Sequence, residues 1–132
     1  AVHTMLDPQV DGVRTMVDDV AERIATLGGS PAGTPGALVA ERTWDDYSVG
    51  RADALAHLGA LDLVYTGVIG DHRAAIARTE EADPVTQDML IAQSGELEQY
   101  QWFVRAHLEN SRGELTSAGA STERDAAAEA AG

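Results

Sequence analysis

The 132-residue chain lacks two residue types altogether, cysteine and lysine. Without cysteine it has no disulfide, no thiolate metal site and no haem attached through a Cys-x-x-Cys-His motif. All nine basic residues are arginine, and 22 aspartates and glutamates give a formal charge of -13. Nucleic-acid binding needs clustered positive charge that displaces counterions, so this balance argues against DNA as a direct partner and favours cations.

Long apolar runs are also missing. No segment approaches the roughly 20 apolar residues that cross a bilayer, and the start lacks the basic and apolar pattern of a signal peptide. The glycines form neither of the phosphate-binding loop motifs, and no nucleophile can be paired with a base, so hydrolysis has no support. We expect one soluble, cytoplasmic domain that does not contact a membrane.

Apolar periodicity predicts three long helices. The first ends at Leu27, because Gly28 and Gly29 are C-terminal stop signals. Pro8 lies within this segment and either marks the first turn or bends the helix. The Gly- and Pro-rich residues 28–47 follow, and we interpret them as a crossover with a short helix at about residues 37–42.

The second long helix is predicted over residues 48–79. The third begins at Asp83, a good capping residue, followed by Pro84 in the favoured first position, and continues to about residue 110. Residues 111–132 are rich in alanine, acidic and poor in large apolar groups, so we expect a flexible or weakly helical tail behind a helical domain of residues 1–110.

Three amphipathic helices leave a gap where a fourth should pack. The fold class is therefore predicted to be all-α, a four-helix bundle with three long helices and a short crossover helix. The chain begins without methionine and already inside a helical pattern. We expect that its N-terminal segment and first helix are missing.

The first predicted helix carries one histidine and three carboxylates on a single face. At about 100° per residue, His3, Asp7, Asp18 and Glu22 fall within a sector of about 100°, roughly 130° from the apolar stripe. Imidazole and hard carboxylate oxygens suit iron, manganese or zinc. The alternative is a solvated acidic helix surface.

The distance along the helix shows whether these four residues can bind one metal ion within a single chain. His3 and Glu22 are nineteen residues apart, about 28 Å, so they cannot hold one ion within one chain. Two copies of the helix crossing antiparallel near Gly12 would bring His3 of one chain opposite Asp18 and Glu22 of the other. The pattern predicts a symmetric dimer with two identical sites, which Gly12 favours because it lets two backbones approach closely.

Several segments carry a more specific signal when taken together. They are the spacing His3-x3-Asp7-x10-Asp18-x3-Glu22, the stretch AERIATLGGSPAGTPG from Ala21, TWDDYSV from Thr43, and QWFVRAHLE ending at Glu109. Over residues 1 to about 124 the chain resembles the Dps family, the DNA-protection-during-starvation branch of the ferritin-like superfamily.

The resemblance implies a hollow dodecamer that oxidises iron(II), preferably with hydrogen peroxide although oxygen is a second oxidant, and stores the ferric mineral. Such a ferroxidase would detoxify iron and protect DNA from oxidative damage. By position, His3 would be a metal ligand from one subunit and Asp18 and Glu22 ligands from its twofold mate. Asp7 would be a nearby acid that supports the site.

Two departures from the family pattern keep alternatives open. The family has an earlier helix with another site histidine, so we expect this chain to be short of one ligand and to be impaired in activity and assembly. Family members that bind DNA use lysine-rich tails, whereas this tail has only two arginines among four acids. The alternatives are a nucleoid-associated protein that compacts DNA with little ferroxidase activity, and a metal-free structural helical oligomer.

The remaining candidate residues have a structural and a functional interpretation. Asp83 and Asp88, near Glu80 and Glu81, favour either helix capping or an acidic pore at a threefold axis that draws iron(II) inward. No acid precedes a histidine by three residues, so a di-iron centre within one bundle is disfavoured. We expect three other histidines to be surface or packing residues: His57, His72 and His107. Trp102 is expected to be a packing residue, or alternatively an aromatic that absorbs radicals near the oxidising site.

Overall fold

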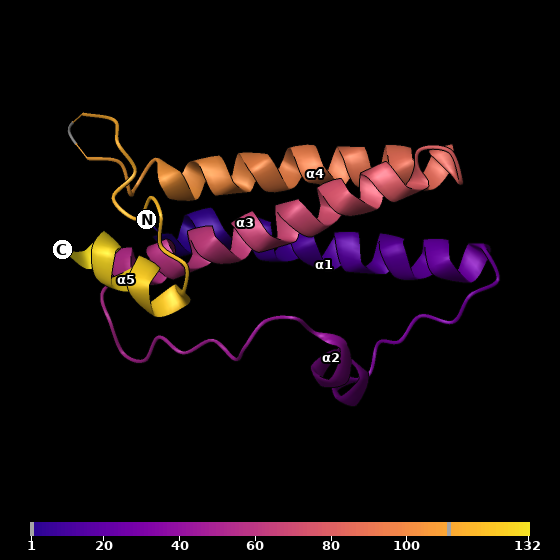
Figure 1. Ribbon diagram of the computed structural model, residues 1–132, viewed down its shortest axis with the longest axis horizontal. Helices are drawn as coiled ribbons and strands as arrows, with labels where there is room; N and C mark the ends of the chain where they lie inside the picture. Colours follow the sequence, from indigo (N-terminus) through magenta and orange to yellow (C-terminus); the bar gives the residue numbers. More distant parts are fainter. Residues whose placement is uncertain (1, 111) are drawn as a thin grey trace. The chain divides into compact units, whose positions relative to one another are not determined.

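The computed structural model describes residues 2–110 and 112–132, and within them it contains five helices and no β-strand (Figure 1). The residues form two compact units, Ala1–Asp46 and Tyr47–Gly132. The first unit contains α1 (Val2–Thr26) and α2 (Pro35–Glu41). The second contains α3 (Ala54–Thr79), α4 (Pro84–Arg105) and α5 (Glu123–Ala131). The predicted all-α class and the three long helices are confirmed.

Helix α1 ends as its glycines predict. Gly28 has a positive φ of 84°, and its N–H donates to the carbonyl of Ala25 at 3.0 Å while Gly29 donates to Ile24 at 2.9 Å. This pair of bonds satisfies the last carbonyls of the helix and requires a residue that tolerates a left-handed backbone. The double glycine therefore stops α1 one residue before the predicted end.

Pro8 lies inside α1 and does not begin it. A proline ring has no N–H to donate to the carbonyl four residues earlier, here that of Thr4. The helix nevertheless starts at Val2, so His3 and Asp7 stand on the same helix as Asp18 and Glu22. The alternative in which Pro8 marks the first turn is wrong.

The apolar stripe of α1 is largely exposed. Val10 and Val17 retain 47% and 66% of their accessible surface. The short helix α2 also has exposed apolar side chains, Leu38 and Val39. It begins two residues before the predicted position because the Thr34 hydroxyl accepts from the N–H of Ala37 at 3.3 Å, a standard N-cap.

In the second unit, α3 begins later than predicted. Asp53 is its N-cap and accepts a hydrogen bond from the N–H of Ala56 at 2.8 Å. Residues 48–53 precede it as irregular chain. Helices α3 and α4 run antiparallel side by side (Figure 1), and the largest fully buried side chains of the unit are Leu58, Leu97 and Val104.

Helix α4 has the predicted Asp83–Pro84 start, and the Asp83 carboxylate accepts a hydrogen bond from the Thr86 hydroxyl. It ends at Arg105 rather than near residue 110. An isolated antiparallel bridge between Glu109 and Leu115 follows, and it reverses the chain toward α5.

Helix α5 lies in the segment that we expected to be a flexible or weakly helical tail. Thr122 caps it by accepting from the N–H of Asp125 at 3.1 Å, and the buried face consists of alanines alone. A Cβ on Gly59 of α3 would lie 2.4 Å from the carbonyl oxygen of Ala126, so the two backbones almost touch. Packing this close needs small residues, which is why a segment without large apolar groups still docks. The domain boundary at residue 110 stays a prediction.

No helix in the described part of the chain has the length and apolar character needed to span a bilayer.

Candidate functional site

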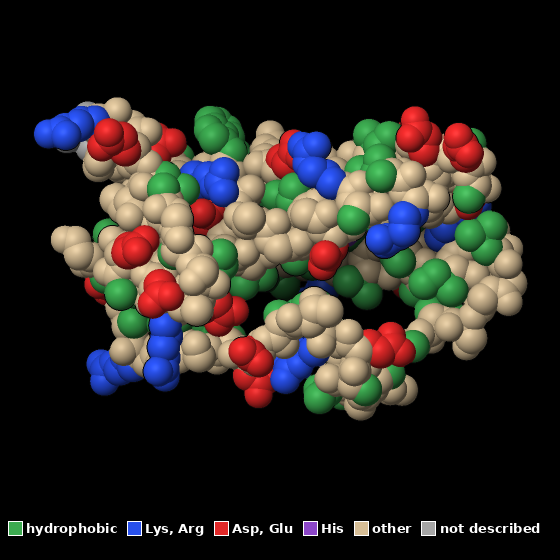
Figure 2. All heavy atoms as spheres, in the orientation of Figure 1, with side chains coloured by type: hydrophobic (Ala, Val, Ile, Leu, Met, Phe, Trp, Pro, Cys, Tyr) green, Lys and Arg blue, Asp and Glu red, His purple; other side chains and the backbone are tan. Residues whose placement is uncertain are grey.

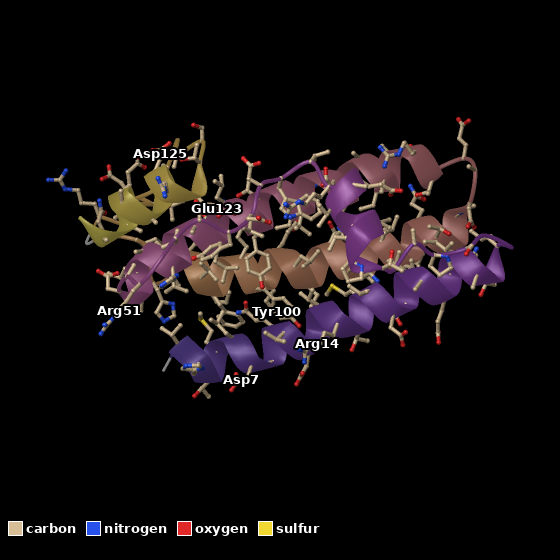
Figure 3. The ribbon with its side chains drawn as sticks, turned by 90° about the horizontal axis from the view of Figure 1, so that it is seen from below. Asp7, Arg14, Arg51, Tyr100, Glu123 and Asp125 are labelled. Carbon is tan, nitrogen blue, oxygen red and sulfur yellow. The ribbon has the colours of Figure 1, made fainter. Side chains whose placement is uncertain are left out.

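The four candidate ligands of α1 lie on one side of an unbroken helix. His3, Asp7, Asp18 and Glu22 are all exposed. Figure 3 shows Asp7 and Arg14, which belongs to the same sector, leaving the same side of α1. A continuous helix with 3.6 residues per turn therefore presents all four side chains along one stripe.

These side chains do not converge within one chain. Among residues 2–110 and 112–132, no three His, Asp or Glu side chains are arranged so that they could hold a metal ion. Asp7 stands one helical turn from His3, and Glu22 one turn from Asp18, so the stripe consists of two separated pairs. Each pair has too few protein ligands for a full coordination sphere, and the shared site stays a prediction.

One of the four acids near the start of α4 occupies the N-cap position, but its side chain makes no capping bond to a backbone N–H. Asp83 is half-buried and is the N-cap residue, whereas Asp88 is exposed one turn further along the helix. Glu80 and Glu81, just before α4, are also exposed. Negative charge near a helix N-terminus is stabilised by the helix dipole. The acidic pore at a threefold axis is not tested by a single chain and stays a prediction.

Each of the three remaining histidines makes a hydrogen bond. His57 Nδ1 lies 2.8 Å from the hydroxyl of Tyr47. His72 Nε2 lies 3.2 Å from Oε1 of Gln93, which links α3 to α4. His107 Nδ1 lies 2.8 Å from the carbonyl of Phe103. Trp102, expected to pack, is 59% exposed and touches Phe103 with ring centroids 5.0 Å apart.

A buried acid on α3 was missed from the sequence. Asp62 keeps only 6% of its accessible surface, and its Oδ1 accepts from Arg105 Nε at 2.7 Å and from Gln101 Nε2 at 2.8 Å. Gln101 also donates to the Thr66 hydroxyl at 2.8 Å. This network joins α3 to α4. The only sequence signal was an acid between the apolar residues Leu61 and Leu63, one helical turn before Thr66.

The pKa of Tyr100 is raised by a neighbouring carboxylate. Its hydroxyl donates to the Glu96 carboxylate one turn earlier on α4. This bond, followed by burial, raises the pKa of Tyr100 from 10.0 to about 12, because the carboxylate favours the protonated phenol and opposes a second negative charge.

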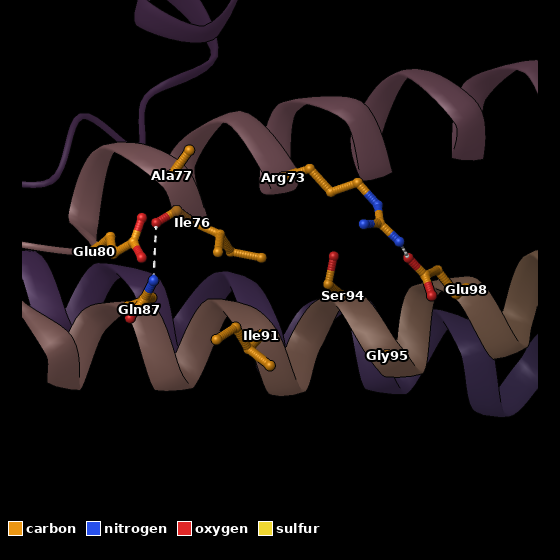
Figure 4. A pocket seen from close by; sticks show the side chains of 9 residues that line it. All are labelled: Arg73, Ile76, Ala77, Glu80, Gln87, Ile91, Ser94, Gly95 and Glu98. Atoms are coloured by element: carbon orange, nitrogen blue, oxygen red, sulfur yellow. Dashed lines mark hydrogen bonds and ion pairs between the residues drawn. The ribbon is translucent and has the colours of Figure 1, made fainter.

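A groove of about 560 Å³ lies between α3 and α4 (Figure 4). Arg73 and Glu98 form an ion pair at one end, and Gln87 Nε2 donates to the carbonyl of Ile76 at 3.4 Å near the other. Ile91 is an exposed apolar residue along the groove. The groove mixes apolar and paired polar groups, and it contains no arrangement of acids and histidines for metal chemistry.

Comparison with known proteins decides the family. Residues 1–113 match the ferritin-like domain. The DNA protection during starvation protein of Mycolicibacterium smegmatis is 64% identical over 126 residues, which cover 96% of this chain and 69% of that protein. This chain belongs to the Dps family of ferritin-like proteins.

Solved structures of Dps proteins agree. The tetragonal form of Mycobacterium smegmatis Dps is 64% identical, with a TM-score of 0.85 over 87% of this chain and 70% of that one. DpsA14 from Streptomyces coelicolor is 69% identical, with a TM-score of 0.85 over 87% and 68%. The predicted Dps resemblance and ferritin-like fold are confirmed, and the chain spans about seven-tenths of these relatives.

Proposed function

We propose that this Dps chain oxidises iron(II) and stores the ferric product inside a cage built from twelve copies. The observation that carries the proposal is the unbroken helix α1, which holds His3, Asp7, Asp18 and Glu22 on one exposed side in a chain of this family. A twofold axis near the middle of α1 would pair His3 of one copy with Asp18 and Glu22 of the other. Asp7 would lie beside His3 and support the site.

Iron is the substrate of this reaction. Two carboxylates and an imidazole offer hard ligands whose negative charge stabilises iron(III) more than iron(II), which favours electron loss. Hydrogen peroxide accepts two electrons, so one molecule can oxidise two iron(II) ions and yield only water. Oxygen is the alternative oxidant. Removing iron(II) and peroxide together would protect DNA, because those two reagents generate radicals when they meet in solution.

Iron(II) would reach the interior along converging carboxylates. Asp83 and Asp88 are the candidates, since a threefold axis at the start of α4 would bring three copies of each together. Three negative charges from each position would attract a divalent cation before it reaches the oxidising site.

The ligand assignment is tested by removing two carboxylates. Asp18→Ala with Glu22→Ala should slow the rise in ferric absorbance, after anaerobic loading with iron(II) and addition of peroxide, by roughly tenfold or more. The matched control is Asp19→Ala with Asp45→Ala, which removes the same charge from exposed positions off this face. An unchanged rate in the first variant would contradict the assignment.

The sharing of one site between two copies has its own test. A His3→Ala chain co-expressed with an Asp18→Ala, Glu22→Ala chain gives mixed dimers in which one site has lost His3, Asp18 and Glu22 and the other keeps all three. Random mixing should therefore restore about a quarter of the wild-type sites, although each variant alone is slowed at all of its sites. No recovery in mixed protein would exclude the antiparallel arrangement.

DNA compaction is not favoured. On the face shown in Figure 2, arginines are scattered among acids and form no continuous basic patch. Gel retardation at low salt should show no shift. A shift that weakens steeply with added salt would revive the alternative, because phosphate contacts have that dependence.

A further inference from the structure

A tyrosine and a histidine form a directed pair at the start of the second unit. The Tyr47 hydroxyl lies 2.8 Å from Nδ1 of His57, and the two rings stack with centroids 6.0 Å apart and an interplanar angle of 23°. Tyr47 lies on the irregular segment before α3, and His57 lies in the first turn of that helix. In the tautomer with the proton on Nε2, the phenol donates its proton toward a free nitrogen lone pair.

A third group brings negative charge to this pair. Glu123, the first residue of α5 (Figure 3), accepts from the N–H of Ser48 at 3.3 Å, next to Tyr47 in sequence. Burial, and then the charge of Glu123, raise the pKa of Tyr47. The phenol therefore keeps its proton at neutral pH, hydrogen-bonded to a base and close to a carboxylate.

These are the requirements for losing one electron from tyrosine. An oxidised phenol is a strong acid, so the electron leaves readily only if a base takes the proton at the same time. The products here would be a neutral tyrosyl radical and an imidazolium ion. The new positive charge would lie in the field of Glu123, which stabilises it.

We propose that Tyr47, His57 and Glu123 form a one-electron oxidation site that intercepts radical oxidants. Tyr47 passes one electron to the oxidant, which leaves as its reduced anion, and passes its phenolic proton to Nδ1 of His57. The oxidants are the one-electron class that arises when peroxide takes a single electron from iron(II). The site uses none of the proposed iron ligands, so it goes beyond the proposed iron oxidation.

Tyr100 is one of the two other tyrosines, and it provides the comparison because it also has a hydrogen-bonded proton acceptor. Its proton acceptor is the Glu96 carboxylate. An ordinary imidazole binds a proton about two pK units more tightly than an ordinary glutamate. Proton transfer from an oxidised tyrosine is therefore more favourable at Tyr47 than at Tyr100, and the radical should form on Tyr47 in preference to Tyr100.

The test uses the full chain without metal and azide radicals made by pulse radiolysis as the oxidant. Electron paramagnetic resonance of freeze-quenched samples should show a tyrosyl radical whose yield falls by more than half in Tyr47→Phe and changes little in Tyr100→Phe. His57→Gln keeps a hydrogen-bonding side chain but cannot take the proton, and it should slow radical formation on the order of a hundredfold. The wild-type rate should fall in heavy water.

Two results would overturn the proposal: a full radical yield in Tyr47→Phe, or an unchanged rate in His57→Gln. Glu123→Gln is a gentler variant, because it can keep the bond from Ser48 while removing the charge, and it should also slow the reaction. Circular dichroism establishes that each variant is folded. Since no iron is present, failure here would leave the proposed iron oxidation untouched, and failure of iron oxidation would leave this site untouched.

Discussion

Within its unit, helix α3 packs against α4 and against α5, and the two contacts are stabilised by different interactions. Against α4 it places a buried carboxylate, Asp62, within a network of directed hydrogen bonds. Against α5 it places Gly59, Ala56 and Ala60, which pack on alanines of α5. The first contact adds charge and bond direction to apolar packing, whereas the second depends on the close approach of two backbones.

Helix α3 therefore selects the helices that pack against it in two different ways. A buried carboxylate is costly unless its partners are all in place, so α4 is accepted in only one register. A smooth surface of small residues excludes any helix that carries larger ones, so α5 is selected by shape. Helix α3 is therefore bound to α4 by hydrogen bonds near its middle, at Asp62, and to α5 by close packing near its start, at Gly59.

The largest predicted effect breaks the polar contact. Asp62→Ala removes the acceptor of Arg105 and Gln101 and should lower the free energy of unfolding by about 3 kcal/mol, measured by urea denaturation. The matched control is Glu98→Ala, which breaks the exposed ion pair with Arg73 between the same two helices and should cost less than about 1 kcal/mol. Equal losses in the two variants would show that burial does not distinguish these pairs.

The next effect breaks the steric contact. Gly59→Ala adds a Cβ that would lie 2.6 Å from the Cβ of Ala130, and it should destabilise the unit by about 2 kcal/mol as α5 shifts. Gly67→Ala on the same helix has open space around it and should instead stabilise α3 by up to about 1 kcal/mol. Opposite signs in thermal melting would confirm that distance, and not helix propensity, governs residue 59.

The smallest effect concerns a bond within α4 that belongs to neither contact. The pKa of Tyr100 is raised from 10.0 to about 12, so between those pH values the folded chain holds a proton that the unfolded chain has lost. The stabilising contribution is complete below pH 10 and disappears as the pH rises toward 12. Tyr100→Phe should flatten this alkaline loss in unfolding experiments; an identical pH profile would contradict the shift.

Much of the helix pattern could be predicted because strong local signals mark it. Gly28 and Gly29 end α1, and Pro84 starts α4, through backbone geometry that only these residue types favour. Helix α5 could not be predicted in the same way. Its alanines give no amphipathic pattern, and it packs closely against Gly59, more than sixty residues earlier in the chain.

In the candidate sites, too, the residues that could be predicted are those that depend on local sequence. Helical periodicity is a local property, so the stripe of His3, Asp7, Asp18 and Glu22 follows from the spacing and the structure places all four on α1. Asp62 and the pair formed by Tyr47 and His57 depend on contacts between segments, which spacing does not encode. How two copies meet is likewise a property of the assembly and stays a prediction.

The hydrogen bond from Ser48 to Glu123 joins the two ends of the second unit. The bonded residues are 75 positions apart, and between them the chain runs out along α3 and back along α4. The second unit is therefore closed on itself by this bond and by the packing of α5 on α3. A force that separates its two ends acts first on these two contacts, so the packing of α5 sets how well the unit resists being pulled apart.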